Sequence, residues 1–477
     1  IECMAMEYNA LMRKLPIGIQ TFEKMREESY LYVDKTELVW RLAYTSTPYF
    51  LSRPRRFGKS LLLSTFEAYF EGKKELFKGL AIEQLEKEWN KYPVLHLDLN
   101  AEKYDAPQRL EQILSNQLTQ WESKYGKGED ETTLSTRFSG IIRRASQQAG
   151  CGVVVLVDEY DKPLLQALDN TELLEDYRNT LKAFYGVLKS SDRYLRFAFL
   201  TGVTKFSQVS VFSDLNQLND ISLKPQYATV CGITRQELID TFTPELQFLA
   251  KANRLTWEET LAKMESTYDG YHFCEFAEGV FNPFSVLNAF DGLKFDSYWF
   301  QTGTPTILVK MLEETEYDLR TLIDGIEAPA STFTEYKMDA SNPSPLIYQS
   351  GYLTIKGWSR NTNSYLLDFP NDEVRRGFIS LLAADYLKPK VSPDSWVLQV
   401  IEALGKGECE KLHQLMVSFF ASIPYSQRRK DDEREKERYF QYTFYLVLRM
   451  ISSYTIFIEK EQSEGRVDCI IETPLYI

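Results

Sequence analysis

Short apolar segments alternate with longer amphipathic segments over roughly the first 225 residues of the chain. The run Gly152–Val157 is continuous and mostly β-branched, which is typical of a strand buried on both faces of a parallel sheet. Pro107 stands where a helix takes proline as its first residue. Strands that alternate with helices predict an α/β layered domain with a parallel sheet. The expected strands are Tyr49–Leu51, Val94–Asp98, Gly152–Val157 and Arg196–Thr201, and the expected helices include Lys59–Tyr69 and Gln108–Tyr125.

The pattern becomes mainly helical from Thr234 onward. Thr234 is followed three residues later by Glu237, and Thr256 is followed in the same way by Glu259. This spacing matches a capping box, in which the threonine side chain and the acidic side chain satisfy free amides of the first helical turn. Two helix starts are therefore predicted in this part of the chain.

Shorter segments follow in 330–395, where Tyr352–Ile355 and Tyr365–Leu367 are strand-like and flank a polar turn. A helical pattern resumes after Pro393. The mixed-charge run Ser426–Arg438 predicts a solvated helix face rather than a binding patch, because its opposite charges nearly cancel.

Composition narrows the function classes. The chain has 477 residues with 55 Lys and Arg against 68 Asp and Glu, and its net charge is −13. This charge excludes a basic surface over the whole chain for nucleic acid but allows a local patch. The longest aliphatic run is far shorter than the ~20 residues of a membrane helix, so no membrane span and a cytoplasmic location are expected.

The six cysteines and three histidines are scattered without metal-ligand spacing. Reduced thiols are expected, with neither a disulfide framework nor a zinc site. The chain starts at Ile1 and stops in the apolar run Leu475–Ile477, which suggests a fragment of a longer protein.

The segment Arg53–Ser60 carries the sharpest chemical signal. An apolar strand, a loop and Gly58-Lys59-Ser60 at a helix start follow one another, as in a phosphate-binding loop. In such a loop, backbone amides hold the anion, the lysine bridges the β- and γ-phosphates, and the hydroxyl ligates Mg²⁺. Arg53 replaces the first glycine of the motif, which is tolerated if the turn keeps a negative φ there. Taken alone, Gly-Lys-Ser is equally well explained as an incidental tripeptide.

A second signal lies at the end of the buried strand, where Asp158 and Glu159 follow Val157. In phosphate-loop ATPases, the first acid orders Mg²⁺ and the next polarises the attacking water. An ordinary strand with an acidic turn is the structural alternative. However, a pair of acids at the end of a buried strand, together with a Gly-Lys-Ser helix start, favours nucleotide binding.

The strand Arg196–Thr201 also ends in polar residues. Thr201 and Thr204 are candidates for sensing the γ-phosphate, or cap a loop, and Lys205 is a candidate source of positive charge. Arg55 and Arg56 contact phosphate or a neighbouring subunit's nucleotide, or are simply solvated. The residues predicted to contact the nucleotide are Arg55, Arg56, Phe57, Gly58, Lys59, Ser60, Leu61 and Thr201.

Ordered motifs over nearly the whole chain resemble the bacterial AAA-ATPase-like proteins that carry a C-terminal PD-(D/E)XK nuclease-like domain. The matching segments are 15–22, 32–36, 53–60, 157–163, 201–207, 213–216, 268–271, 282–285, 298–300 and 302–305. The resemblance implies ATP and Mg²⁺ as cofactors, with Lys59 and Ser60 on phosphate and metal and Asp158 with Glu159 as the acidic pair. It also implies that 32–36 lies near the nucleotide. Packing of a small helical lid is the more favoured role for 268–273, His272 included.

The resemblance divides the chain into four parts. They are an AAA-like P-loop core at 1–225, a helical lid at 226–329, a winged-helix-like α+β region at 330–395 and the N-terminal part of a nuclease-like domain at 396–477. In the last part, Asp468 resembles the first metal ligand of the nuclease site, and Glu437 is an additional candidate acid. The Glu-x-Lys of the next strand would come after Ile477, so nuclease activity is not expected of this chain.

The leading hypothesis is a P-loop ATPase that couples hydrolysis to a conformational change. In it, Lys59 stabilises phosphate charge, Ser60 and Asp158 order Mg²⁺, and Glu159 positions the water. The family resemblance adds DNA or RNA as a partner and a homo-oligomer as an assembly in which neighbours lend an arginine. One rival hypothesis is a nucleotide-switched binding module with little hydrolysis, and another is a scaffold in which Gly-Lys-Ser is incidental.

Overall fold

The computed structural model describes residues 13–100, 102–205, 211–212, 217–300, 325–330, 333, 344–387, 393–422, 455–462 and 465–473. Its centre is a sheet of five described strands in the order β2-β3-β4-β1-β5. Each described neighbour pair is parallel. The carboxyl ends of the strands therefore meet at one edge of the sheet, where Leu51 pairs with Thr201 and Asp98 with Asp158. The strands are β1 (Tyr49–Ser52), β2 (Val94–Asp98), β3 (Val153–Asp158), β4 (Leu195–Gly202) and β5 (Asn219–Asp220).

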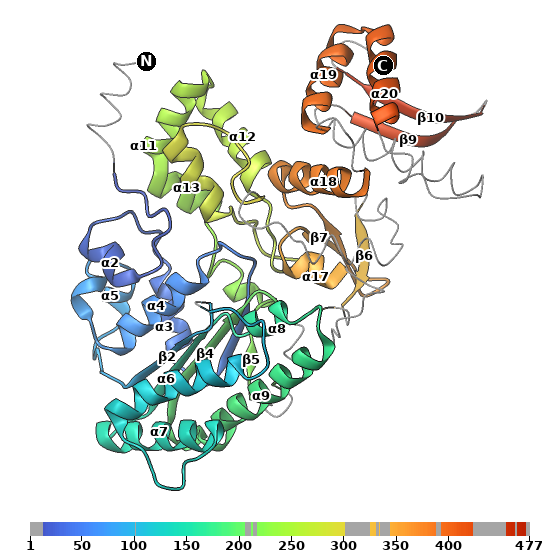
Figure 1. The fold of residues 1–477 in the computed structure, drawn as a ribbon. Coiled ribbons are helices and arrows are strands. Elements are labelled where there is room, and N and C mark those ends of the chain that lie inside the picture. Colours follow the sequence, from blue (N-terminus) through green and yellow to red (C-terminus); the bar gives the residue numbers. More distant parts are fainter. Residues whose placement is uncertain are drawn as a thin grey trace.

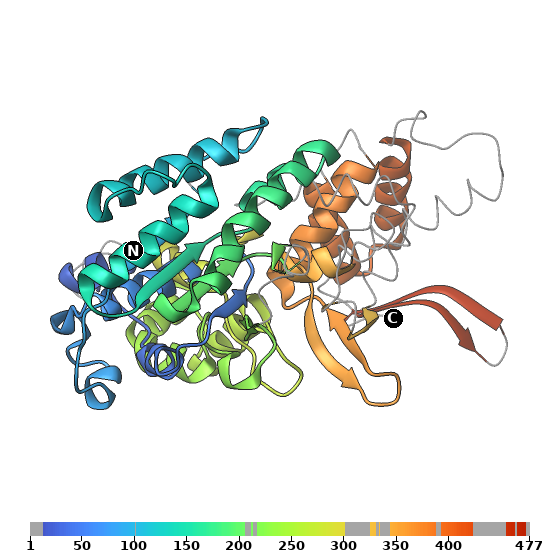
Figure 2. The ribbon, with the colours of Figure 1, turned by 90° about the horizontal axis from the view of Figure 1, so that it is seen from below.

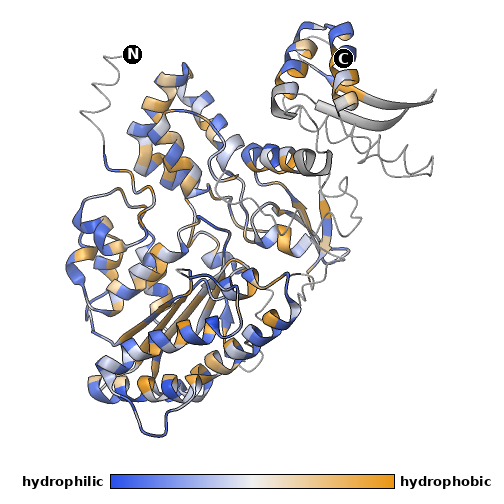
Figure 3. Ribbon diagram, viewed as in Figure 1, coloured by the Kyte–Doolittle hydropathy of each residue, from blue (hydrophilic) through white to orange (hydrophobic). Residues whose placement is uncertain are grey.

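Side chains of β3 and β4 alternate between two hydrophobic cores, one on each face of the sheet. Val154 and Leu156 face one core and Val153 and Val155 face the other. Accordingly, β3 is apolar from Val153 to Val157 and β4 is apolar from Phe197 to Leu200. Hydrophobic positions dominate the central strands in Figure 3. Burial on both faces explains why β3 lacks a polar alternation.

Helices cover both faces (Figures 1 and 2). Helices α3 and α4 pack in the core of one face, where Phe66 lies 5.1 Å from Phe197 between ring centroids. Helices α6, α7 and α9 supply the core of the other face. The elements of this region are α2 (Phe22–Glu27), α3 (Thr36–Ala43), α4 (Lys59–Phe70), α5 (Ile82–Leu85), α6 (Arg109–Tyr125), α7 (Leu134–Ala149), α8 (Lys162–Gln166) and α9 (Thr171–Ser190).

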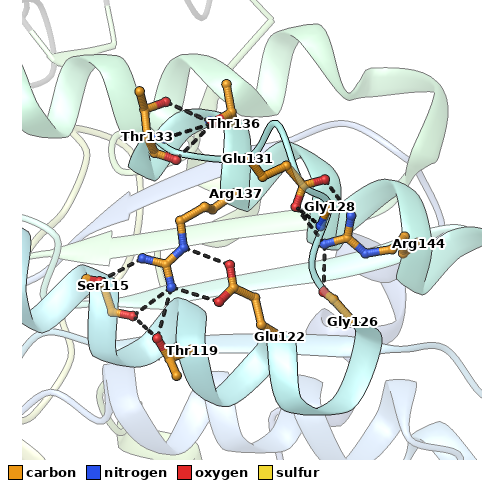
Figure 4. A network of polar contacts seen from close by, with 10 residues as sticks. All are labelled: Ser115, Thr119, Glu122, Gly126, Gly128, Glu131, Thr133, Thr136, Arg137 and Arg144. Carbon is orange, nitrogen blue, oxygen red and sulfur yellow. Dashed lines mark hydrogen bonds and ion pairs between the residues drawn. The ribbon is translucent and has the colours of Figure 1, made fainter.

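A polar clamp joins α6 to α7 at the edge of the second layer (Figure 4). The guanidinium of Arg137 donates to both carboxylate oxygens of Glu122 and to the side chains of Ser115 and Thr119. Arg144 holds Glu131 with one bond at 2.5 Å and another at 2.8 Å. Both carboxylates are more than nine-tenths buried. Such pairing is what permits charges to be buried between two helices.

Three helices lie beyond the sheet, in the region predicted to be a lid: α11 (Arg235–Asn253), α12 (Trp257–Tyr268) and α13 (Pro283–Gly292). We refer to them as the lid. Thr234 and Thr256 form the two predicted capping boxes with Glu237 and Glu259. Both predicted helix starts are confirmed.

The following region contains an antiparallel sheet in the order β6-β8-β7, together with α17 and α18. Further along the chain, α19 and α20 pack against each other, and β9 pairs with β10 as an antiparallel ribbon. No helix among the described residues is long and apolar enough to cross a bilayer. These elements are β6 (Ile326–Pro329), α17 (Ser344–Gln349), β7 (Thr354–Ser359), β8 (Ser364–Asp368), α18 (Asp372–Leu387), α19 (Pro393–Lys406), α20 (Cys409–Ser422), β9 (Thr455–Gln462) and β10 (Gly465–Glu472).

The α/β prediction and the four predicted strands of the core are confirmed to within about one residue. The predicted start of α6 is wrong. Pro107 lies outside the helix, because Gln108 adopts a left-handed φ of 66° as the N-cap and the helix begins at Arg109. Cys151, Cys231, Cys274 and Cys409 are free thiols, as predicted.

Candidate functional site

The phosphate-loop candidate runs from the carboxyl end of β1 straight into α4. Gly58 caps α4 with φ 90°, a left-handed conformation that favours glycine. The first-turn amides of α4 have no acceptor within the helix, and together with the helix dipole they form an anion-binding end. The loop therefore has the local geometry that its sequence predicted.

Arg53 occupies the position of the first glycine of the motif, and its side chain is buried away from solvent. Its guanidinium donates to the carbonyl oxygens of Ser52, Ser222 and Tyr227, and it lies 3.9 Å above the ring of Phe273. Its φ is not positive, so glycine is not required there. Burial lowers the pKa of Arg53. Arg53 thus anchors the loop to segments far along the chain.

Lys59 and Glu159 meet at the edge of the sheet. Lys59 Nζ lies 3.3 Å from Glu159 Oε1, and it also donates to the carbonyl oxygens of Arg53 and Pro54. The Lys59 side chain is 4% exposed and that of Glu159 is 16% exposed. The lysine predicted to bind phosphate and the acid predicted to polarise water therefore form an ion pair.

Asp158 lies beside this pair, between Ser60 and Thr201. Thr201 Oγ1 donates to Asp158 Oδ1 at 2.7 Å. Burial raises the pKa of Asp158, while a hydrogen bond with Ser60 acts in the opposite direction. The two residues predicted to order Mg²⁺ thus contact each other. Thr201 is fully buried behind Asp158, so its predicted contact with nucleotide stays a prediction.

Asp161 organises the acidic loop, a role that the sequence analysis did not assign. Its carboxylate accepts from the amides of Val203 and Thr204 and from the hydroxyl of Thr204. Burial, with the charge of Glu159, raises the pKa of Asp161 to about 6. Tyr160 adds a hydrogen bond from its hydroxyl to the carbonyl of Thr204. The loop that carries Asp158 and Glu159 is therefore fixed to the end of β4.

These bonds bear on the alternatives for the end of β4, where Thr204 also lines the cavity described below. The predicted γ-phosphate role of Thr201 and Thr204 stays a prediction. Thr204 Oγ1 caps the acidic loop through Asp161, as the loop-capping alternative has it. Lys205 forms an ion pair of 2.8 Å with Asp220, and its backbone amide donates to Gln349. The charge of Lys205 is thus neutralised at β5.

A cavity of about 940 Å³ opens over this edge of the sheet. Its lining includes the loop residues Arg55 to Leu61 and the acid Glu159. Tyr32, Val33 and Lys35 also lie on its wall, and they belong to the segment 32–36 that the resemblance implies is near the nucleotide. Pockets for small molecules and cofactors have volumes of roughly 300–1,000 Å³, so the space is large enough for a nucleotide.

The lid and the following region close directly on the phosphate loop. Trp299 Nε1 donates to the carbonyl oxygen of Arg55 at 3.0 Å. The ring of Phe57 makes an edge contact with Tyr271 at 4.7 Å. Gly351 packs so closely that a Cβ built on it would lie 2.7 Å from Pro54. The segment around Tyr271 therefore serves packing, as predicted.

The donor set suits magnesium with its nucleotide better than a metal held by protein alone. Among the described residues, no three His, Cys, Asp or Glu side chains form a metal-binding group. Mg²⁺ is commonly held by one or two carboxylates with substrate phosphates and waters. Ser60 and Glu159 line the cavity, and the buried Asp158, which is hydrogen-bonded to Ser60, completes that kind of partial set behind them.

The predicted nuclease residues are only partly within the described residues. Asp468 lies on β10, which pairs with β9 in the antiparallel ribbon, and Glu437 lies outside the described residues. The segments 206–207, 213–216 and 302–305 of the resemblance also lie outside them.

Comparison with known proteins assigns the class. Residues 16–212, which contain Lys59, Ser60, Asp158 and Glu159, match the family described as "Predicted AAA-ATPase". The chain is also 37% identical over 465 residues to the "Uncharacterized protein in vnfD 5'region" of Azotobacter chroococcum mcd 1, covering 96% of this chain and 87% of the relative. The chain belongs to the same family as this relative, and its N-terminal part is AAA-ATPase-like.

A solved structure of the ORC2 protein of Aeropyrum pernix, in ADPNP and ADP complexes, is 11% identical and covers 71% of this chain and 87% of that one. Its TM-score of 0.27 is too low to support a shared arrangement of elements.

Proposed function

We propose that this protein binds ATP with Mg²⁺ in the cavity over β1, β3 and β4 and hydrolyses it to ADP and phosphate. The observation that carries the proposal is the convergence of Lys59, Glu159, Asp158 and Ser60 at one edge of the sheet. These are the groups that phosphoryl transfer requires, because its catalysis is mostly positioning and charge stabilisation.

The contacts support a role for each residue in this proposal. Lys59 is within reach of the loop carbonyls and Glu159, so its ammonium can hold the β- and γ-phosphates at the mouth of the loop. Glu159 accepts a proton as the oxygen of water bonds to the γ-phosphorus. The bond between that phosphorus and the bridging oxygen then breaks, leaving ADP and phosphate. Bound Mg²⁺ supplies neutralisation of phosphate charge, and Ser60 with Asp158 would hold it.

Release of phosphate from ATP by the purified chain with Mg²⁺ tests the proposal. Lys59→Ala should abolish turnover, whereas Lys189→Ala, an exposed lysine at the end of α9, should leave it unchanged. Equal turnover in the Lys59→Ala variant would contradict the proposal. Unaltered thermal unfolding with excess Mg·ATP would favour the scaffold hypothesis, since ligand at 100 times its Kd stabilises by about 2.7 kcal/mol.

The hydrogen bond from Trp299 to Arg55 favours conformational coupling. In this coupling, nucleotide binding at the phosphate loop changes the conformation of the lid and of the region after it. A nucleotide switch with little hydrolysis would use the same contacts. Glu159→Gln separates the two functions, because it should stop turnover in an ATPase and change little in a switch.

Action on DNA or RNA, and assembly into a homo-oligomer, are proposed from the family resemblance alone. Phosphate release with and without added DNA or RNA tests the first, and sedimentation with and without nucleotide tests the second. Stimulation of turnover by one nucleic acid would identify the partner class.

A further inference from the structure

Six cationic side chains line the cavity, and they differ in what neutralises them. Lys59 pairs with Glu159, and Lys35 pairs with Glu237 at 2.6 Å. Within the described part of the chain, no ion pair is formed by the other four. The six are Lys35, Arg55, Arg56, Lys59, Lys103 and Lys162.

Lys162 has the most fixed position of the four unpaired cations. Its backbone amide donates to the carbonyl oxygen of Glu159 at 3.0 Å, so it is held one turn from the acid that contacts Lys59. Its side chain is half-buried, and Nζ donates to Oδ1 of Asn100 at 3.1 Å. Asn100 is a neutral acceptor, which positions the ammonium without neutralising its charge.

Asn100 itself is held by the neighbouring strand end. Its backbone amide donates to Oδ1 of Asp98 at 2.8 Å, and the backbone amide of Leu99 donates to the carbonyl oxygen of Asp158. The tips of β2 and β3 thus set the place of Lys162 on the cavity wall. Asn100 follows β2, and β2 lies on the other side of β3 from β4 and β1 in the sheet. The ammonium of Lys162 is therefore tethered on the side of the acidic loop away from β1, the strand that leads into the phosphate loop.

The other unpaired cations are placed differently. Arg55 and Arg56 belong to the phosphate loop itself, and the guanidinium of Arg56 lies 4.8 Å above the ring of Phe284. Lys103 is exposed. Of these four cations, Lys162 alone has a half-buried side chain that donates to a neutral acceptor and a backbone amide that is hydrogen-bonded to the acidic loop.

We propose that Lys162 contacts the γ-phosphate of bound ATP from the side opposite the phosphate loop. The inference rests on the proposed function and adds a cation that the chain supplies from within its own site. The positive charge of Lys162 acts on the phosphoryl oxygens as negative charge redistributes in the transition state. With a cation supplied in this way, an arginine from a neighbouring subunit is not required for turnover.

Binding experiments test the contact without depending on hydrolysis. Affinities for ADP and for the non-hydrolysable analogue AMP-PNP, both with Mg²⁺, are measured by titration calorimetry on the full chain. Lys162→Met should weaken AMP-PNP binding at least tenfold and leave ADP binding within twofold of the parent. Lys162→Arg should restore most of the AMP-PNP affinity, and Lys189→Met should change neither. Retained ADP binding shows that the variant is folded.

The outcomes separate the two proposals. If Lys162→Met binds AMP-PNP as tightly as the parent does, or loses both nucleotides equally, the contact with the γ-phosphate is overturned while nucleotide binding stands. If the parent chain binds neither nucleotide, the proposed function fails and this inference fails with it. Specific turnover that rises with protein concentration would overturn the statement that no neighbouring subunit is required.

Discussion

Glu159 Oε1 lies 3.3 Å from Lys59 Nζ, so the acid proposed to polarise water also shares the charge of the lysine proposed to hold phosphate. Both side chains are largely buried, and the attraction between them is therefore stronger than it would be in open solvent. Binding of a polyphosphate has to compete with Glu159 for Lys59.

This relationship gives opposite expectations for binding and turnover. Glu159→Gln removes the competing charge and the proton acceptor together. We expect ATP affinity to rise several-fold and turnover to fall by about 10²–10⁴. Titration calorimetry and phosphate release measure the two effects, and Glu129→Gln, an exposed acid in the α6–α7 connection, is the control. Weaker ATP binding in Glu159→Gln would contradict this account.

Replacing Arg53 should destabilise the protein even though glycine is common at its position. Arg53→Met keeps much of the side-chain volume but leaves the carbonyl oxygens of Ser52, Ser222 and Tyr227 without their donor. Each unsatisfied buried group costs about 1–3 kcal/mol, so a loss of roughly 3 kcal/mol is expected. Urea unfolding measures it, with the exposed Arg360→Met as control. An unchanged midpoint would show that the anchor contributes nothing.

Gly202→Ala should damage the acidic loop. A Cβ at this position would lie 2.6 Å from Asp161 Oδ1 and from the ring of Tyr160. Asp161 would have to leave the amides that fix it, and overpacking of this kind costs about 1–3 kcal/mol. The midpoint temperature of thermal unfolding and the rate of phosphate release should both fall. Gly186→Ala in α9 is the matched control, since nothing lies within 4 Å of its Cβ and stability should rise slightly.

Trp299 should report on nucleotide binding. Because its indole donates to the backbone of Arg55, a ligand that moves the loop changes the environment of the ring. We expect ATP to change tryptophan fluorescence, and Trp299→Phe to remove most of that change while keeping the packing against Tyr352. An unchanged fluorescence response to ATP in the Trp299→Phe variant would show that another tryptophan reports the binding.

The α6–α7 clamp should make stability depend on pH below neutrality. Hydrogen bonds from Arg144 hold the pKa of Glu131 below its ordinary value, and those from Arg137 do the same for Glu122. A lowered folded-state pKa adds stability above the unfolded value of about 4.3, and this stability is lost as the pH falls through the folded-state pKa.

The double variant Glu122→Gln/Glu131→Gln tests this sign. It should be less stable than the parent at pH 7 by about 3–6 kcal/mol, because each glutamine accepts only one of the two arginine bonds and a hydrogen bond to a charged group contributes about 1.5–3 kcal/mol. The gap should shrink toward pH 3. Urea midpoints at the two pH values measure it. A gap that widens in acid would contradict the sign.

The sequence predicted those features whose causes are local. Continuous apolar runs identified β3 and β4, and the threonine and glutamate spacing identified the starts of α11 and α12. Gly58-Lys59-Ser60 and Asp158-Glu159 were paired correctly, because parallel strands must end at one edge.

Features that depend on distant partners were not predictable in this way. Arg53 finds its acceptors at Ser222 and Tyr227, about 170 residues away. Asp161 is explained only by the amides of Val203 and Thr204 on another strand. The helix starts at Arg109 because the backbone of Gln108 is in the left-handed region, and no local motif predicted that conformation.

The contacts of Arg53 show that the segment matched by the family is shorter than the segment needed to hold the phosphate loop in place. The family match ends at residue 212, yet the acceptors of Arg53 and the ring beneath it come from 222, 227 and 273. A chain cut at residue 212 would keep every catalytic candidate but lose two carbonyl acceptors and the aromatic ring that hold the guanidinium of Arg53. The smallest autonomous unit that carries this phosphate loop therefore includes the lid, so insertions and fusions are better placed after the lid than at the end of the recognised segment.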